Sequence, residues 1–105
     1  MRRLLLLLAM LTAPAQARTV TATVYDPWYN GRPDYCTGKP YRHWGLSAAH
    51  AYIKCGTLVR VTHGNRSLVV PITDRCDCNS IDLSAGAAYR LRVPLDGVAT
   101  VGISY

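Results

Sequence analysis

The sequence predicts a small, mainly β domain, a closed barrel of about six short strands with one short helix and two stabilising disulfides. Three observations support this prediction. Short β-branched runs alternate with turns that are rich in Gly, Pro and Asn. Only one segment, after Ser84, has the pattern of a complete helix. Four cysteines follow a candidate export signal in a chain of 105 residues, which leaves no room for two domains.

Residues 1–17 have the pattern of a secretory signal peptide. Met1-Arg2-Arg3 is basic, the run from Leu4 to Leu11 is apolar, and Ala15-Gln16-Ala17 is the small-x-small pattern that precedes cleavage. The apolar run is too short to span a bilayer as a helix, and a membrane anchor or a buried N-terminal helix is the alternative. We therefore expect a mature domain of residues 18–105, periplasmic or secreted, with no membrane attachment after cleavage.

The first half of this domain is expected to contain one strand and a long loop. Residues 19–25 are β-branched or aromatic, which predicts a strand. Residues 26–38 contain several Pro, Gly and Asn residues and predict a loop. The pattern around residues 46–50 allows one helical turn.

The second half begins with a hairpin. Two β-rich runs, residues 57–62 and 66–73, surround a turn at residues 63–65. Pro71 cannot donate a hydrogen bond to a neighbouring strand, so we expect it at an edge or a strand crossing. The short apolar step at residues 81–83 precedes Ser84, which is placed to cap a helix over residues 85–91. Residues 98–105 predict a last strand, with one apolar face made of Ala99, Val101 and Ile103.

The cysteines are expected to form disulfides, because their number is even and the chain carries an export signal. Zinc is the alternative, but structural zinc sites usually have two Cys-x(2–4)-Cys pairs, and this chain has a single pair with a closer spacing. We therefore predict no metal and no cofactor. The pairing stays open, although a bridge between the last two cysteines would close a very small ring. The four residues are Cys36, Cys55, Cys76 and Cys78.

Five short motifs occur together along the domain, in a fixed order and with characteristic gaps. They cover nearly all of residues 21–103 and resemble the RlpA-like (rare lipoprotein A) domain, a double-psi β-barrel that is related to barwin and expansin domains. The motifs are Ala22-Thr23-Val24-Tyr25, Leu46-Ser47-Ala48-Ala49-His50, the run from Cys55 to Thr62, Thr73-Asp74-Arg75 and Ile81-Asp82-Leu83-Ser84.

The resemblance implies action on peptidoglycan, including cleavage of peptide-free glycan strands by lytic transglycosylases. One acid/base group can serve both halves of that reaction. The resemblance casts Asp74 as the leading acid/base, Asp82 as its partner or as a substrate-binding carboxylate, and His50 as a catalytic residue of the groove. A barwin-like pairing would join Cys36 with Cys55 and leave the other two cysteines together, in conflict with the steric expectation.

The sequence departs from the family pattern where active members carry acidic residues. Lys39 replaces the Glu of a Gly-Glu pair that is thought to be catalytic, and Arg42 stands at the next acidic position. The chain contains no Glu, so any carboxylate chemistry must use one of its six Asp residues. These replacements support an alternative function, a non-catalytic polysaccharide-binding module of expansin or barwin type.

The partner predicted from the side chains is a cell-wall polysaccharide. Aromatic rings stack on the apolar faces of sugars, and the candidates for this contact are Tyr25, Trp28, Tyr41 and Trp44. Residues 18–105 carry ten basic and six acidic side chains, which favours approach to anionic wall polymers. The basic residues are dispersed, which argues against nucleic acid as the partner. We expect a monomer, and a secreted inhibitor that acts on another protein is a third possibility.

Overall fold

The computed structural model describes residues 17–105, so the predicted signal peptide, apart from Ala17, lies outside the described residues. The elements are β1 (Ala17–Val24), the 3-10 helix η1 (Pro27–Tyr29), β2 (Ala48–Ala49), β3 (Leu58–His63), β4 (Arg66–Asp74), β5 (Ile81–Leu83), α2 (Ala85–Leu91) and β6 (Ala99–Ser104). The predicted mainly β architecture with one short helix is confirmed.

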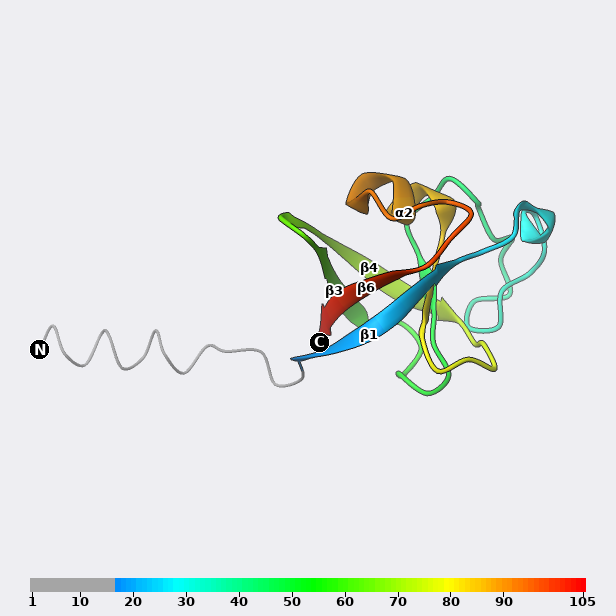
Figure 1. The fold of residues 1–105 in the computed structure, drawn as a ribbon. Helices are drawn as coiled ribbons and strands as arrows, with labels where there is room; N and C mark the ends of the chain where they lie inside the picture. The colour runs from blue at the N-terminus through cyan, green and yellow to red at the C-terminus, as the bar shows by residue number, and fades with distance from the viewer. Residues whose placement is uncertain (1–16) are drawn as a thin grey trace, which may run out of the picture.

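The six strands form a closed barrel in the order β1-β5-β2-β4-β3-β6. β1 pairs with β5 and β2 pairs with β4 in parallel, whereas the remaining neighbours are antiparallel. Figure 1 shows β1 and β6 crossing the front of the barrel, with α2 above it and the long connection that contains η1 at one side. That connection, between β1 and β2, supplies most of the irregular backbone around the candidate site described below.

The barrel interior is filled by aliphatic side chains. Alternate residues of each strand point inward, as the period of two in a strand requires, so β3 alternates exposed and buried positions from Leu58 to Val61. Val101 and Ile103 on β6 are buried as predicted, and Ala99 packs against the same core while partly exposed. The largest fully buried side chains are Ile72, Ile81, Leu83, Leu91, Val59, Val61, Val70 and Val101.

Two local predictions meet different outcomes. Ser84 caps α2 as predicted, because its side-chain oxygen accepts from the N–H of Ala87. The helical turn predicted at residues 46–50 is wrong: Ala48 and Ala49 form the short strand β2 instead. Both alanines are buried, and β2 pairs with β4 on one side and with β5 on the other. Tertiary pairing thus overrides a weak local helical pattern.

Both predicted disulfides are present, and the structure settles their pairing. Cys36 is bonded to Cys55 and Cys76 to Cys78. The steric expectation that Cys76 and Cys78 would each find a distant partner is therefore wrong. Their Cα atoms lie 5.2 Å apart, within the range usual for disulfides. Cys36 meets Cys55 because both loops bond to the end of β4, through the carbonyls of Thr73 and Ile72.

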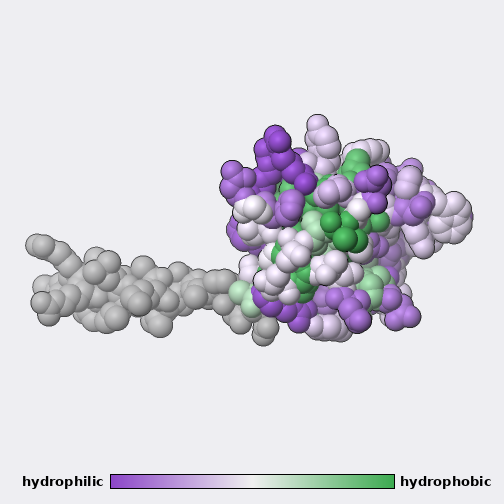
Figure 2. Space-filling model, viewed as in Figure 1, coloured by the Kyte–Doolittle hydropathy of each residue, from purple (hydrophilic) through white to green (hydrophobic). Residues whose placement is uncertain are grey.

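The surface carries scattered apolar groups. Figure 2 shows hydrophobic residues interspersed with hydrophilic ones on the face that carries β1 and β6. Between residues 17 and 105, no helix is both long enough and apolar enough to cross a membrane.

Candidate functional site

Two predicted site residues, Asp74 and Asp82, lie on neighbouring parts of the barrel wall. Ala49 on β2 is in register with Asp74 of β4 on one side and with Asp82 of β5 on the other. Asp82 is in turn in register with Thr23 of β1. Both neighbours of Asp82 on β5 are buried in the core, so its own side chain points to the outer face. The fold therefore brings the two aspartates to one patch of the outer wall.

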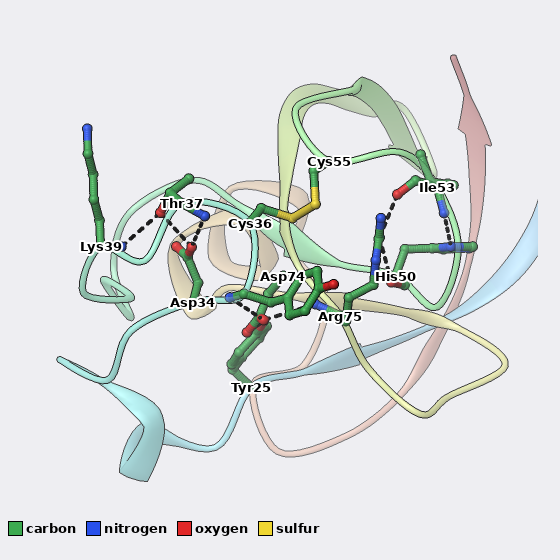
Figure 3. Close-up of a disulfide and its surroundings, with 11 residues drawn as sticks. Tyr25, Asp34, Cys36, Thr37, Lys39, His50, Ile53, Cys55, Asp74 and Arg75 are labelled. Carbon is green, nitrogen blue, oxygen red and sulfur yellow. Dashed lines mark hydrogen bonds between the residues drawn. A yellow bond between two sulfur atoms is a disulfide. The ribbon is translucent and has the colours of Figure 1, made fainter.

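The carboxylate of Asp74 accepts three hydrogen bonds of 2.9 Å. The hydroxyl of Tyr25 donates to Oδ2, and the backbone N–H groups of Tyr35 and Arg75 donate to Oδ1. Figure 3 shows Tyr25 and Arg75 on either side of this carboxylate. A register shift between Ala48 and Ala49 leaves Thr73 as an extra residue in β4, and such bulges redirect the next side chain. The side chain of Asp74 is thus fixed from three sides.

Asp82 is held differently. Its Oδ1 accepts a 3.0 Å hydrogen bond from the hydroxyl of Thr23. Burial raises the pKa of Asp82 above its usual value, and the negative charge of Asp74 raises it further, although the hydrogen bond from Thr23 acts in the opposite direction. The carboxyl group of Asp82 therefore holds its proton more tightly than an exposed aspartate does.

The four predicted sugar-stacking residues fall into two groups. Tyr25 and Tyr41 are stacked on each other with centroids 4.3 Å apart, and they are only 7% and 5% exposed. Burial raises the pKa of Tyr41 to about 12 and raises that of Tyr25 still more. Trp28 and Trp44 are instead 62% and 64% exposed. The tyrosines form a wall beside the aspartates. The Trp44 ring is exposed, whereas the guanidinium of Arg32 lies over the ring of Trp28, 3.4 Å from its centroid.

His50 is not brought together with the two aspartates. Its backbone N–H donates to the carbonyl of Asp74, but its imidazole points away from the Asp74 carboxylate (Figure 3). The ring is buried, and its Nδ1 accepts the N–H groups of Tyr52 and Ile53. Burial lowers the pKa of His50, and the positive charges of Arg18 and Arg75 lower it further. The structure therefore places a neutral imidazole on a different side of β2.

The two positions where the family pattern expects acidic residues line a small cavity. Lys39 and Arg42 border a space of about 340 Å³ together with Asp34, Tyr41 and Thr73. The carboxylate of Asp34 accepts hydrogen bonds from the N–H and the hydroxyl of Thr37. Figure 3 shows that Lys39 extends away from Asp74. The cavity is thus lined by two cations and by one aspartate that is bonded within its own turn, and Asp74 and Asp82 are not among its lining residues.

The start of α2 positions the loop that carries Trp44. The hydroxyl of Ser84 donates to the carbonyl of Gly45 and accepts from the N–H of Ser47. A Cβ on Gly86 would collide with the carbonyl oxygens of Trp44 and Gly45, so this close approach requires glycine. The motif Ile81-Asp82-Leu83-Ser84 therefore supplies both a site carboxylate and the support for the loop beside it.

Sequence reasoning missed three groups of the site. Thr23 and the N–H of Tyr35 bond to the aspartates, and the guanidinium of Arg75 donates to the carbonyls of His50 and Ile53. Thr23 was detectable, since the alternation of β1 puts it on the same face as Tyr25. The other two contacts depend on loop geometry that no sequence pattern encodes. Within residues 17–105 no group of three or more His, Cys or Asp side chains has the arrangement of a metal site.

Comparison with known proteins identifies the family. The model of a family described as lytic transglycolase matches residues 21–103. An uncharacterized protein of Synechocystis sp. is 40% identical over 86 residues, with 80% of this chain and 93% of that protein covered. A probable endolytic peptidoglycan transglycosylase RlpA of the same organism is 37% identical over 87 residues, and that of Rickettsia felis is 32% identical over 103 residues.

The coverage of the named transglycosylases is partial. The match covers 78% of this chain but 27% of the Synechocystis enzyme, and 88% of this chain but 45% of the Rickettsia felis enzyme. Among solved structures, a Streptomyces papain inhibitor is similar with a TM-score of 0.68 and 25% identity, covering 87% of this chain and 94% of the inhibitor. The chain belongs to the lytic transglycolase family, whose RlpA-like domain is a double-psi β-barrel.

Proposed function

We propose that this family member is an exported protein that acts on the glycan strands of peptidoglycan as a lytic transglycosylase, with Asp74 and Asp82 as its catalytic carboxyl groups. The observation that carries the proposal is the register of Asp74 and Asp82 on either side of Ala49. The names of the relatives, endolytic peptidoglycan transglycosylases, support the choice of substrate.

The environments of the two carboxyl groups suggest a division of labour. In a lytic cleavage the bond between the anomeric carbon and the leaving oxygen breaks, and the 6-hydroxyl oxygen of the same sugar bonds to that carbon. The leaving oxygen gains a proton and the 6-hydroxyl loses one. Asp82, whose pKa is raised, suits the donor. Asp74 is the other carboxyl group of the pair and would take the 6-hydroxyl proton on Oδ2, which accepts one hydrogen bond, whereas Oδ1 accepts two.

The aromatic side chains have separate roles in this proposal. Trp44 presents an exposed ring on which a sugar would stack, and Trp28 would stack with the part of its ring that the Arg32 guanidinium leaves uncovered. Tyr25 and Tyr41 keep the carboxyl groups in place, since Tyr25 bonds to Asp74 and stacks on Tyr41. His50 contributes through its backbone bond to Asp74, and its imidazole lies outside the proposed reaction.

Purified sacculi test the proposal. After their stem peptides have been removed, the parent protein is expected to release soluble glycan fragments from them. Asp74→Asn and Asp82→Asn are each expected to reduce release by about 100-fold or more, as for loss of a general acid or base. Asp96→Asn is the matched control, because Asp96 is exposed and follows α2. Release that persists in both site variants would contradict the assignment of the carboxyl groups.

A second candidate function is a non-catalytic wall-binding module. It is favoured by Lys39 and Arg42, which line a cavity and stand at the two positions where the family pattern has acids. This function predicts that the protein sediments with sacculi without releasing fragments. Trp28→Ala and Trp44→Ala should each weaken sedimentation, whereas Tyr89→Ala, which removes a ring that is 70% exposed on α2, should leave it unchanged. Unchanged binding in both tryptophan variants would count against it.

Export and a monomeric state complete the proposal. The disulfides Cys36–Cys55 and Cys76–Cys78 support an oxidising compartment. The mass of the protein recovered from the periplasm or medium tests the predicted cleavage after Ala17. A chain that keeps residues 1–17 in that fraction would contradict it. Sedimentation equilibrium of the exported protein tests whether it is a monomer.

A further inference from the structure

The hydrogen bonds of His50 determine which of its ring nitrogens carries a proton. Nδ1 accepts the backbone N–H groups of Tyr52 and Ile53, each at 3.2 Å. A nitrogen that accepts has no hydrogen of its own, so the neutral imidazole must carry its proton on Nε2. Nε2 is therefore a donor that needs an acceptor.

The group that faces this donor is another donor. Nη2 of Arg18 lies 3.4 Å from Nε2 of His50, and a guanidinium has N–H groups and no acceptor. Two donors cannot satisfy each other. The side chain of His50 is only 4% exposed, and a buried donor without a partner is costly. The arrangement lacks an acceptor between the two nitrogens.

Both donors are held in place by the fold. Arg18 is in register with Ile103 of β6, which fixes its backbone. Its guanidinium lies over the ring of Tyr52, 5.5 Å from the centroid, where a cation is attracted to the ring face. Tyr52 in turn meets the imidazole of His50 edge to face, with centroids 4.6 Å apart. The convergence of the two donors is therefore a built feature of this side of the barrel.

A cavity of about 340 Å³ opens beside these donors. Its other polar walls are the hydroxyl-bearing Thr19 and Tyr52 and the amide-bearing Asn79, and no carboxylate belongs to the lining residues that the structure describes. The guanidinium of Arg75, bonded to the carbonyls of His50 and Ile53, adds a second positive charge nearby. The two arginines contribute to lowering the pKa of His50, so the local field is positive. Such a cavity suits a small anion.

We propose that Arg18 and His50 form a binding site for one oxyanion group, a carboxylate or a phosphate, which accepts hydrogen bonds from the Arg18 guanidinium and from Nε2–H of His50. The imidazole points away from Asp74 (Figure 3), so this site is separate from the proposed reaction centre. Wall polymers offer both groups, as the lactyl carboxylate of muramic acid in peptide-free strands and as phosphodiesters. The inference goes beyond the proposed function and holds for a catalytic or a non-catalytic protein.

The tautomer of His50 is the first test. Nitrogen-15 NMR of the imidazole in the exported, oxidised protein distinguishes a protonated nitrogen from an unprotonated one. The expected result is a protonated Nε2 and an unprotonated Nδ1 at neutral pH. A protonated Nδ1 would make Nε2 an acceptor for Arg18, and the site would then be complete without an anion. That result would overturn the proposal.

Titration with defined probes is the second test. Acetate, N-acetylmuramic acid and inorganic phosphate are added separately, with N-acetylglucosamine as the neutral control. At least one anion should shift the Nε2 resonance of His50, and Arg18→Gln should weaken its binding by about tenfold or more, as for loss of a charge-assisted hydrogen bond. The probe that binds most tightly shows whether the site prefers a carboxylate or a phosphate.

Arg90→Gln provides the matched control for charge, because Arg90 is exposed in the last turn of α2 and does not line this cavity. It should leave the affinity within about twofold of the parent, since exposed charges at a distance are screened by salt. If Arg18→Gln and Arg90→Gln weakened anion binding equally, the loss would come from the change in net charge alone, and the proposed site would be overturned. No shift of the Nε2 resonance with any anion would overturn it as well.

Discussion

Tyr25 donates its phenolic hydrogen to Oδ2 of Asp74 across 2.9 Å, and this bond joins the end of β1 to the end of β4. The tyrosine is 7% exposed, so the contact is shielded from water. The same carboxylate accepts two backbone N–H groups on its other oxygen. The central carboxylate of the site is therefore also a structural link between the barrel and its loops.

Removal of this link should destabilise the protein. Tyr25→Phe keeps the ring that stacks on Tyr41 but deletes the donor, so the free energy of unfolding should fall by about 2 kcal/mol, as for a hydrogen bond to a charged group. Denaturant titration measures the loss. Tyr35→Phe is the control, because its ring is 73% exposed, and equal stability of the two variants would contradict the role of the Tyr25 hydroxyl.

Asp82 should make stability depend on pH. Its pKa is raised above 3.8, so the folded state binds this proton more tightly than the unfolded chain does. The contribution to stability is complete below pH 3.8 and is lost as the pH rises through the folded pKa. Asp82→Asn removes the ionisation and keeps an oxygen for the Thr23 hydroxyl. We expect a higher melting temperature than that of the parent at pH 7 and a smaller difference at pH 3.

Thermal unfolding of both proteins at the two pH values checks this expectation. Asp96→Asn serves as the control, because Asp96 is exposed. A difference between Asp82→Asn and the parent that stays constant with pH would show that Asp82 titrates as an ordinary exposed carboxyl.

Gly86 should not tolerate a side chain. A Cβ there would collide with the backbone of Trp44 and Gly45, which cannot move without disturbing the cap at Ser84. Gly86→Ala should therefore lower the free energy of unfolding by about 1 to 3 kcal/mol, the usual cost of overpacking. In Gly102→Ala the Cβ would meet Thr62 at an ordinary 3.9 Å, so this control should lose less. Calorimetry of Gly86→Ala and Gly102→Ala measures the two losses of stability. Equal losses would contradict the close approach of Gly86 to the backbone of Trp44 and Gly45.

The two disulfides should differ in their contribution to stability. Cys36 and Cys55 are separated by 19 positions and Cys76 and Cys78 by 2. A larger loop restricts the unfolded chain more, so replacing the first pair by serines should cost about 3 kcal/mol and replacing the second about 1.5 kcal/mol. Chemical denaturation of the two double variants tests the order. A greater loss from the second pair would contradict it.

Much of the fold follows from local sequence patterns. The hairpin of β3 and β4, the capped helix and the last strand lie within one residue of the predicted bounds at each end. Each of these elements has either alternating apolar and polar residues or a helix cap, together with a clear turn. The conformation that the local sequence favours is therefore the one that tertiary packing also requires. β2 is different, because its two alanines become a strand only by pairing with β4 and β5. The pairing of Cys76 with Cys78 was likewise not determined by the sequence alone.

The candidate site was predictable only in its chemistry. The motif residues Asp74, Asp82 and His50 were visible in the sequence, but their mutual arrangement depends on strand register and on the bulge at Thr73. The same limit applies to exposure. Tyr25 and Trp44 are both aromatic, and only the fold buries the first and exposes the second. The donor pair of Arg18 and His50 depends on the contact of β1 with the segment that follows β2, and no spacing in the sequence encodes it.

The most direct measurement is a digest of peptide-free glycan strands by the exported, oxidised protein, with mass spectrometry of the products. We expect fragments with 1,6-anhydro ends, which are the product of attack by the 6-hydroxyl, and their loss in Asp74→Asn. Fragments with ordinary reducing ends, or no fragments while the protein still sediments with sacculi, would contradict lytic cleavage by this site.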